Sequence, residues 1–219
     1  MTVGAPRIAV VDYGAGNLVS IEQGLTASGG DVVIATDARA FDAADAIVVP
    51  GVGAAAPAMH RLQGAGLVEP ILDWVAADRP FLGVCLGLQL LFESSDEDGA
   101  RTFGVLSGRT QRLAGAPTLP HIGWNQVERR RSHPLFDGIG EGADFYFVHS
   151  YAGAPKEADD GAVLADTEHG GRFVSAVARG NLLGVQFHPE RSGDDGLRLL
   201  ANFVGLVRAG GRAPAAAAS

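Results

Sequence analysis

Four short, uninterrupted apolar runs in the first part of the chain constrain its fold more than any other feature. They are Ile8–Val11, Val32–Ala35, Ala46–Val49 and Phe81–Val84. Runs of this kind are typical of strands covered on both faces, as in a parallel sheet. Between them, apolar residues recur at helical spacing. One such segment contains Leu18, Ile21 and Leu25 after a capping Asn17, and another contains Leu67, Ile71, Leu72 and Val75.

This alternation predicts an α/β fold, with a mostly parallel sheet flanked by helices and joined by right-handed crossovers. After Val105 the strand-like pieces come closer together and helical patterns become scarce. The expected strands are Gln126–Glu128, Phe145–His149, Val163–Ala165, Phe173–Ala178 and Leu182–Phe187. Their spacing favours antiparallel strands that extend one edge of the sheet. A last helix is expected over Gly193–Val207, with Leu197, Leu200 and Val204 on one face.

The whole pattern reads as one domain over residues 1–208, followed by a tail over 209–219 that we expect to be disordered. The most apolar stretch, Pro80–Phe92, is too short to cross a bilayer. The start of the chain lacks the apolar core of a signal peptide, so we expect a cytoplasmic protein without membrane contact. A formal net charge of −8 argues against a nucleic-acid partner.

The only cysteine, Cys85, lies at the end of an apolar run, with Gly83 and Gly87 two residues to either side. This is the spacing of a nucleophile on a sharp strand-to-helix turn, where small neighbours let the chain fold back on itself. The helix-prone segment Leu88–Phe92 follows, and a helix N-terminus favours thiolate. A structural cysteine in the core of a sheet remains an alternative from the spacing alone.

A second motif, His188-Pro189-Glu190, follows the apolar strand Leu182–Val185. Pro189 favours an extended backbone at His188, and side chains two residues apart on an extended segment share a face. Glu190 can therefore orient the His188 imidazole while its other nitrogen faces a thiol, the arrangement of a nucleophile triad. A zinc site at Cys85, His188 and Glu190 is not excluded by residue type, but it gives the glycine-flanked turn no purpose.

The turn Pro50-Gly51-Val52-Gly53 ends another strand, and parallel strands end at the same edge of a sheet. Its backbone N–H groups could join that of Leu86 as an oxyanion hole, although an ordinary strand-to-helix turn explains the glycines as well.

Two other motifs give weaker indications of function. Gly14 and Gly16 begin a dinucleotide-binding pattern, but the position that needs a third glycine holds Val19. The run Arg129–Arg131 is expected to form a solvated turn. We expect no cofactor and no metal.

The motifs around Cys85 and His188 resemble those of class I, triad-type glutamine amidotransferases. Four further stretches resemble the glutaminase subunits of imidazole glycerol phosphate synthases in particular, and the likeness runs from about Arg7 to Arg208. The four stretches are Asp12–Leu18, Pro50–Gly53, Pro120–Asn125 and Tyr146–Tyr151. The resemblance implies a flavodoxin-like fold, with Cys85, His188 and Glu190 as the catalytic triad.

The resemblance also implies roles for other residues. Glutamine would be held by Gln89, His149, Ser150 and Tyr151, and the oxyanion by N–H groups of Leu86 and of the Val52–Gly53 turn. Ammonia would pass to a (β/α)₈-barrel cyclase in a heterodimer, which would form imidazole glycerol phosphate and aminoimidazole carboxamide ribotide in histidine biosynthesis. The partner would contact His121, Trp124, Asn125 and Arg191.

Arg191 stands where such subunits usually carry lysine, and the two are not equivalent. In the family the oxyanion turn is set correctly only when the liganded partner is bound, which implies weak glutaminase activity in isolation. Two other readings stay open. One is the amidotransferase component of anthranilate or aminodeoxychorismate synthesis, and the other is a catalytically silent regulatory subunit on the same scaffold.

Overall fold

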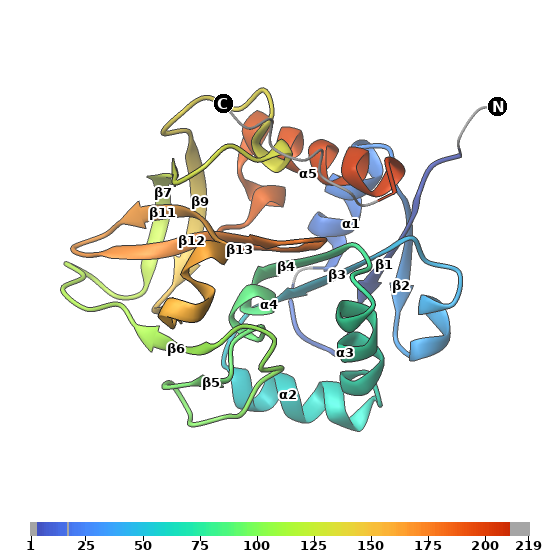
Figure 1. Cartoon of the computed structure of the whole chain (residues 1–219), viewed down its shortest axis with the longest axis horizontal. Helices are drawn as coiled ribbons and strands as arrows, with labels where there is room; N and C mark the ends of the chain where they lie inside the picture. The colour runs from blue at the N-terminus through green and yellow to red at the C-terminus, as the bar shows by residue number, and fades with distance from the viewer. Residues whose placement is uncertain (1–3, 17, 211–219) are drawn as a thin grey trace.

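A central sheet of eight strands organises the molecule (Figure 1). We describe it from a computed structural model, which covers residues 4–16 and 18–210. Five neighbouring strands are parallel, in the order β2 (Asp31–Ala35), β1 (Arg7–Val11), β3 (Ala46–Gly51), β4 (Phe81–Cys85) and β13 (Leu182–Val185). Three antiparallel strands continue the sheet, in the order β12 (Arg172–Arg179), β11 (Val163–Glu168) and β8 (Glu128–Arg129). The predicted α/β fold with an antiparallel extension is confirmed.

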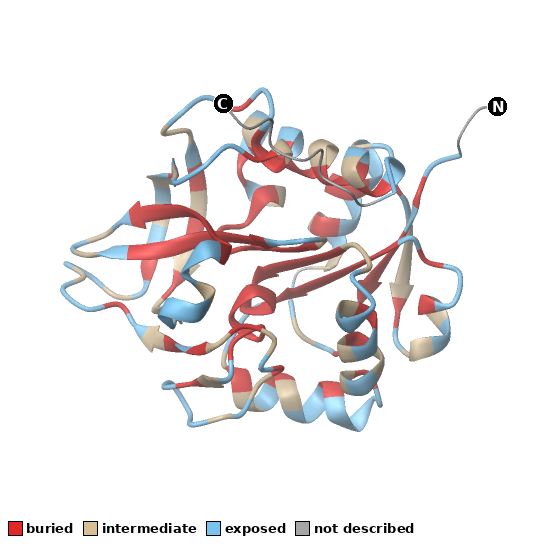
Figure 2. Cartoon of the chain, in the orientation of Figure 1, coloured by how far each residue is buried: buried red, intermediate tan, exposed pale blue. Residues whose placement is uncertain are grey.

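Helices cover both faces of the parallel strands (Figure 1). On one face lie α1 (Leu18–Ala27) and α5 (Gly193–Arg208), and on the other lie α2 (Ala55–Gly64) and α3 (Val68–Ala76). Alternate residues of β1 enter the two cores, Ile8 and Val10 on the α1 side and Ala9 and Val11 on the α3 side. The central strands are buried along their length, as Figure 2 shows. Their uninterrupted apolar runs therefore reflect cover on both sides.

The expected helices α1, α3 and α5 are present, whereas the pattern gave no sign of α2. The buried positions of α2 are Ala55, Ala58 and Leu62, and two alanines make a weak apolar stripe. In α5, Leu197 does not share the buried face with Leu200 and Val204, since it is 42% exposed. The cap expected at residue 17 lies outside the described residues, as does the tail beyond residue 210.

Two small sheets stand beside the central one. One pairs β7 (His121–Gln126) with β9 (Asp144–His149), and the other orders β10 (Tyr151–Pro155), β6 (Gly108–Arg112) and β5 (Ser94–Ser95). The expected strand over 126–128 is wrong, because the chain changes sheets there and the N–H of Val127 donates to Ala143 O. The short helices are α4 (Leu86–Gln89) and the 3₁₀ turns η1 (Ala38–Phe41), η2 (Pro134–Phe136), η3 (Glu157–Ala162) and η4 (Pro189–Arg191).

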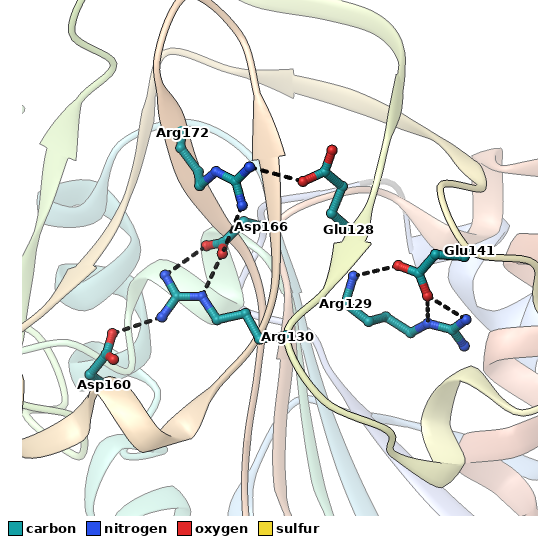
Figure 3. A network of polar contacts seen from close by, with 7 residues as sticks. All are labelled: Glu128, Arg129, Arg130, Glu141, Asp160, Asp166 and Arg172. Carbon is teal, nitrogen blue, oxygen red and sulfur yellow. Dashed lines mark hydrogen bonds and ion pairs between the residues drawn. The ribbon is translucent and has the colours of Figure 1, made fainter.

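The three arginines at 129–131 do not form the solvated turn that we expected. Arg129 forms an ion pair with Glu141, and Arg130 pairs with Asp160 and with Asp166, whose carboxylate is almost fully buried (Figure 3). Arg131 donates to the carbonyl of Ala178 on β12. The run therefore fastens the outer strands to the segments around them. No helix in the described residues is long and apolar enough to span a membrane.

Candidate active site

Cys85 lies on a strained turn between β4 and α4. Its backbone has φ 55° and ψ −107°, a left-handed conformation that is unusual for a residue with a side chain. A Cβ on Gly87 would lie 1.8 Å from the carbonyl oxygen of Val49, and one on Gly83 would lie 2.6 Å from the backbone of Gly87. The two glycines thus allow the backbone to fold back against β3 and β4, as the spacing predicted.

The helix after Cys85 is shorter than expected. It ends at Gln89 after a single turn, and Leu90, Leu91 and Phe92 continue as a fully buried turn. The carbonyl groups of these three residues accept hydrogen bonds from the backbone of residues 103–106 instead of continuing a helix. A helix dipole is therefore not the main support for a thiolate here.

His188 and Glu190 meet as the extended backbone predicted. His188 has φ −102° and ψ 94°, and its Nδ1 lies 2.8 Å from Glu190 Oε1. Both side chains are almost completely buried. The backbone N–H of His188 donates to Tyr146 O, and Ser192 Oγ donates to His188 O, so the loop is anchored at both ends of this residue.

The second imidazole nitrogen of His188 is buried and forms no hydrogen bond within the described residues. Burial lowers the pKa of His188, but the interactions with the ionised Cys85 sulfur and with the Glu190 carboxylate outweigh it and raise that pKa to about 10. At neutral pH His188 is therefore protonated, which is the form that stabilises a thiolate on Cys85. Sulfur, imidazole and carboxylate are brought together from positions far apart along the chain.

The glycine-rich turn is placed beside Cys85 by strand register. Gly51 pairs with Cys85 across β3 and β4, and Gly53 follows with a φ of +93°. Tyr13 braces the turn because its hydroxyl donates to Pro50 O at 3.0 Å. Burial chiefly, and then the nearby Cys85, raise the pKa of Tyr13, so it remains a neutral donor.

A pocket of about 160 Å³ opens at Cys85. Its lining includes most of the residues expected to hold substrate or oxyanion, namely Gly53, Leu86, Gln89, His149, Ser150 and Tyr151. Val52 does not line it and is largely exposed. Glu97, Pro120 and Val148 also line it. Pro120 and Val148 belong to stretches that carry the resemblance but had no role assigned, and the sequence gave no signal for Glu97. Burial and the adjacent Asp98 raise the pKa of Glu97, which is the one carboxylate that the described residues contribute to the lining.

Two histidines connect the pocket with strand β7. His149 Nδ1 lies 2.8 Å from Tyr151 O, and His149 Nε2 lies 3.1 Å from His121 Nδ1. Because a carbonyl only accepts, His149 carries its proton on Nδ1, and His121 donates from Nδ1 to His149 Nε2. Burial, assisted by the neighbouring histidines, lowers the pKa of His149 to about 3, and burial and His169 lower that of His121 to about 4. Both rings are therefore neutral.

The four residues expected to contact a partner separate into two groups. His121 is only 4% exposed, and Asn125 donates to His121 Nε2 and to Glu168 O, so both point inward. Contact of His121 and Asn125 with a partner stays a prediction. Trp124 is 56% exposed, and Ile122, two residues earlier on the same face of β7, is 59% exposed. Arg191 stacks on Tyr146, which contacts Trp124 edge to face.

Sequence reasoning also missed Gln186. This fully buried residue accepts from Gln89 and lies against Cys85. It stands two residues before His188, so the same-face argument that joined His188 to Glu190 could have found it.

Comparisons with known proteins agree with this geometry. Residues 9–206 match the family described as Glutamine amidotransferase class-I. The chain is 45% identical over 197 residues to a Dehalococcoides mccartyi protein named imidazole glycerol phosphate synthase subunit HisH, covering 90% of this chain and 95% of that protein. A protein of the same name from Moorella thermoacetica is 47% identical over 207 residues, covering 94% and 98%.

Among solved structures, the chain is similar to PurLQS from Thermotoga maritima, with a TM-score of 0.70. The identity is 19%, and the likeness covers 92% of this chain and 98% of that one. At this identity the comparison supports the fold alone. The family match extends over Cys85, the pocket and the loop of His188.

Proposed function

The chain belongs to the class I glutamine amidotransferase family, and on this premise we propose that it is the glutaminase subunit of an imidazole glycerol phosphate synthase. The observation that carries the proposal is Cys85 on its strained turn at a pocket, close enough to the paired His188 and Glu190 to raise the pKa of His188. The two HisH proteins support the choice of pathway, since each is covered almost completely by the alignment.

In the proposed reaction, the Cys85 thiolate attacks the side-chain amide carbon of glutamine. The resulting oxyanion accepts hydrogen bonds from the N–H of Leu86 and from the Val52–Gly53 turn. Protonated His188 gives its proton to the leaving nitrogen, which departs as ammonia and leaves a thioester on Cys85. Neutral His188 then takes a proton from water, and hydroxide attacks the thioester. The Cys85 thiolate and protonated His188 are thereby restored, and the product leaves as glutamate after its carboxyl group releases a proton to solvent. Glu190 orients the imidazole throughout.

The pocket lining fits an amino acid. Glu97 presents a carboxylate suited to the α-ammonium group of glutamine. Both N–H groups of Gln89 are used within the protein, by Tyr151 O and by Gln186 Oε1, so Gln89 has its carbonyl oxygen to offer the substrate. Ser150 and Tyr151 complete the expected binding set. His149, being neutral and hydrogen-bonded on both nitrogens, shapes the pocket without adding a charge.

The proposed partner is a barrel-type cyclase that receives the ammonia. The exposed face of β7, which carries Ile122 and Trp124, is an apolar surface next to Arg191 and Tyr146. Exposed aromatic side chains bordered by arginine are typical of the centre of a protein interface. The surface lies on the face of β7 opposite His121 and Asn125, and Ile122 pairs there with Val148, which lines the pocket.

The decisive experiment reconstitutes the chain with a cyclase and compares two nitrogen sources. With Cys85→Ala, we expect the complex to lose at least about 10³-fold of its glutamine-dependent activity, because the nucleophile is gone. Ammonium salt should still support cyclisation at the rate of the unsubstituted complex. Glutamine-dependent activity that survives in Cys85→Ala would overturn the assignment of the nucleophile.

Two further measurements separate the rival functions. Binding to a chorismate-using synthase instead of the cyclase would place the subunit in anthranilate or aminodeoxychorismate synthesis. A glutamine-analogue electrophile should label Cys85 in the complex, and absence of an adduct there would favour a silent regulatory subunit.

A further inference from the structure

Gln186 lies directly behind the nucleophile. It follows β13, it is fully buried, and its backbone N–H donates to Ser175 O on β12 at 2.9 Å. Its side-chain Nε2 lies 3.6 Å from Cys85 Sγ, within the range of an N–H···S hydrogen bond. The pocket lining among the described residues does not include Gln186, so this amide meets the sulfur from the protein side.

The orientation of this amide follows from its neighbours. The carbonyl of Tyr151 can only accept, so the group of Gln89 that lies 2.8 Å from it must be the NH₂ group. The same NH₂ group lies 3.1 Å from Gln186, which must therefore present its oxygen to Gln89. With its oxygen occupied in this way, Gln186 turns its own NH₂ group to Cys85. The carbonyl of Tyr151 thus determines, through Gln89, which side-chain atom of Gln186 faces the sulfur of Cys85.

The network is anchored at several points, so the donor is held in place. Tyr151 O accepts a second hydrogen bond from His149, and the backbone oxygen of Gln89 accepts one from Thr110 Oγ1 at 3.3 Å. The residues involved are buried, apart from Tyr151, which is partly exposed. A buried and fully connected polar network keeps its geometry better than isolated pairs do.

We propose that Gln186 is a positioning residue for the nucleophile, whose side-chain N–H holds Cys85 Sγ toward His188 and stabilises its thiolate form. The proposal rests on the proposed function, since it assigns the sulfur as the attacking atom. The physical reason is that a hydrogen bond to the charged form of a group favours that form. The thiolate is then held from two sides, by the His188 imidazolium and by a neutral amide.

The test uses the single cysteine of the chain. Alkylation by iodoacetamide, followed by mass spectrometry, reports on Cys85 alone, and its rate against pH gives the midpoint of thiolate formation. Gln186→Met removes the donor with little change of volume, and we expect the midpoint to rise by about one pH unit. In the complex with the cyclase, kcat for glutamine should fall about tenfold with KM nearly unchanged.

Gln186→Glu replaces the donor by a like charge. It keeps the shape and the oxygen that accepts from Gln89, but once ionised it faces the sulfur with a carboxylate and no donor. We therefore expect its midpoint to rise further than that of Gln186→Met, because a carboxylate also repels the thiolate. The donor role itself is read from the neutral variant Gln186→Met, whose midpoint would stay unchanged if Gln186 only filled space.

Ser175→Ala serves as the control, because Ser175 is a fully buried neighbour whose hydroxyl has no hydrogen-bond partner in the described residues. Its midpoint should equal that of the unsubstituted chain. An unchanged midpoint in folded Gln186→Met or Gln186→Glu, or a loss confined to KM, would overturn the proposal. Alkylation needs no glutamine turnover, so it answers even if the experiment on Cys85→Ala contradicts the proposed function.

Discussion

The two halves of the molecule fix their functional groups by different means. In the parallel half, backbone register sets the site: Gly51 lies opposite Cys85, and Val185 lies opposite Val84 just before the loop of His188. In the antiparallel half, contacts between side chains fix the positions of the functional groups. The Arg130–Asp166 pair fastens the outer strands, and the His121–His149 pair supports the pocket wall.

The difference determines what each half tolerates. A position defined by two backbones in contact has no free torsion to relax through, so a single added carbon must move a strand. A position held by side chains can lose one contact while the backbone remains in place, at a cost limited to that contact. Substitutions in the two halves should therefore differ both in size and in how far they spread.

Gly87→Ala should produce the largest effect. The new Cβ would lie 1.8 Å from Val49 O, and a backbone atom cannot rotate away. We expect a loss of more than about 3 kcal/mol in the free energy of unfolding, measured by urea denaturation. Gly64→Ala in α2 is the matched control, since nothing lies within 4 Å of its Cβ, and it should gain about 0.5–1 kcal/mol. Equal stabilities for the two variants would contradict the conclusion that backbone contacts fix the site in the parallel half.

The next effect is a dependence of stability on pH that comes from His188. Its pKa is raised from 6.5 to about 10 in the folded protein, so between these values the folded chain holds a proton that the unfolded chain releases. The contribution is complete below pH 6.5, and it is lost as the pH rises through 10. The contribution of His188 to the slope of stability against pH should therefore be negative across this window.

Urea denaturation of the unsubstituted chain and of His188→Gln, at several pH values across that window, measures this slope. The variant should show a flatter dependence because it lacks the titrating ring. Parallel curves for the two proteins would show that the raised pKa is not a property of His188.

Asp166→Asn should lower the free energy of unfolding by less, about 1–2 kcal/mol, and leave the geometry around Cys85 unchanged. The carboxylate is buried, but Arg130 is partly exposed and keeps Asp160 as a partner. The control is Asp31→Asn, which breaks a half-exposed pair with Arg7 and should cost less than about 0.5 kcal/mol. A changed rate of Cys85 alkylation in Asp166→Asn would mean that the antiparallel half also sets the nucleophile.

Trp124→Ala should have the smallest effect on the isolated chain, within about 0.5 kcal/mol by thermal denaturation, because the side chain is mostly exposed. Its effect should appear with the cyclase, as a loss of affinity of about tenfold or more in a titration. Unchanged affinity would remove the outer face of β7 from the proposed interface.

The parallel half was largely predictable from the sequence, because its information is local. A run such as Phe81–Val84 shows burial on both faces, and the glycines around Cys85 mark the close backbone approach. The contact between His188 and Glu190 was equally predictable. Pro189 favours an extended backbone at His188, and the two-residue spacing then puts both side chains on one face.

The antiparallel half was less predictable because its contacts join distant segments. The sequence around Arg130 does not indicate that its partner is Asp166. Glu97 reaches the pocket from a turn that contains no recognisable motif. For a related reason, the burial of His121 was not predicted. The motif located the right strand, but which face of that strand turns inward depends on its pairing with β9.

The alternation along β7 also bears on how such a protein can diverge. His121 and Asn125 face inward, whereas Ile122 and Trp124 face outward, within five consecutive residues. Mutations at the outward positions can fit the subunit to a new companion while the glutamine-binding chemistry stays as it is. An insertion or deletion of one residue in this strand would exchange the two sets at once, so lineages should accumulate substitutions here but not length changes.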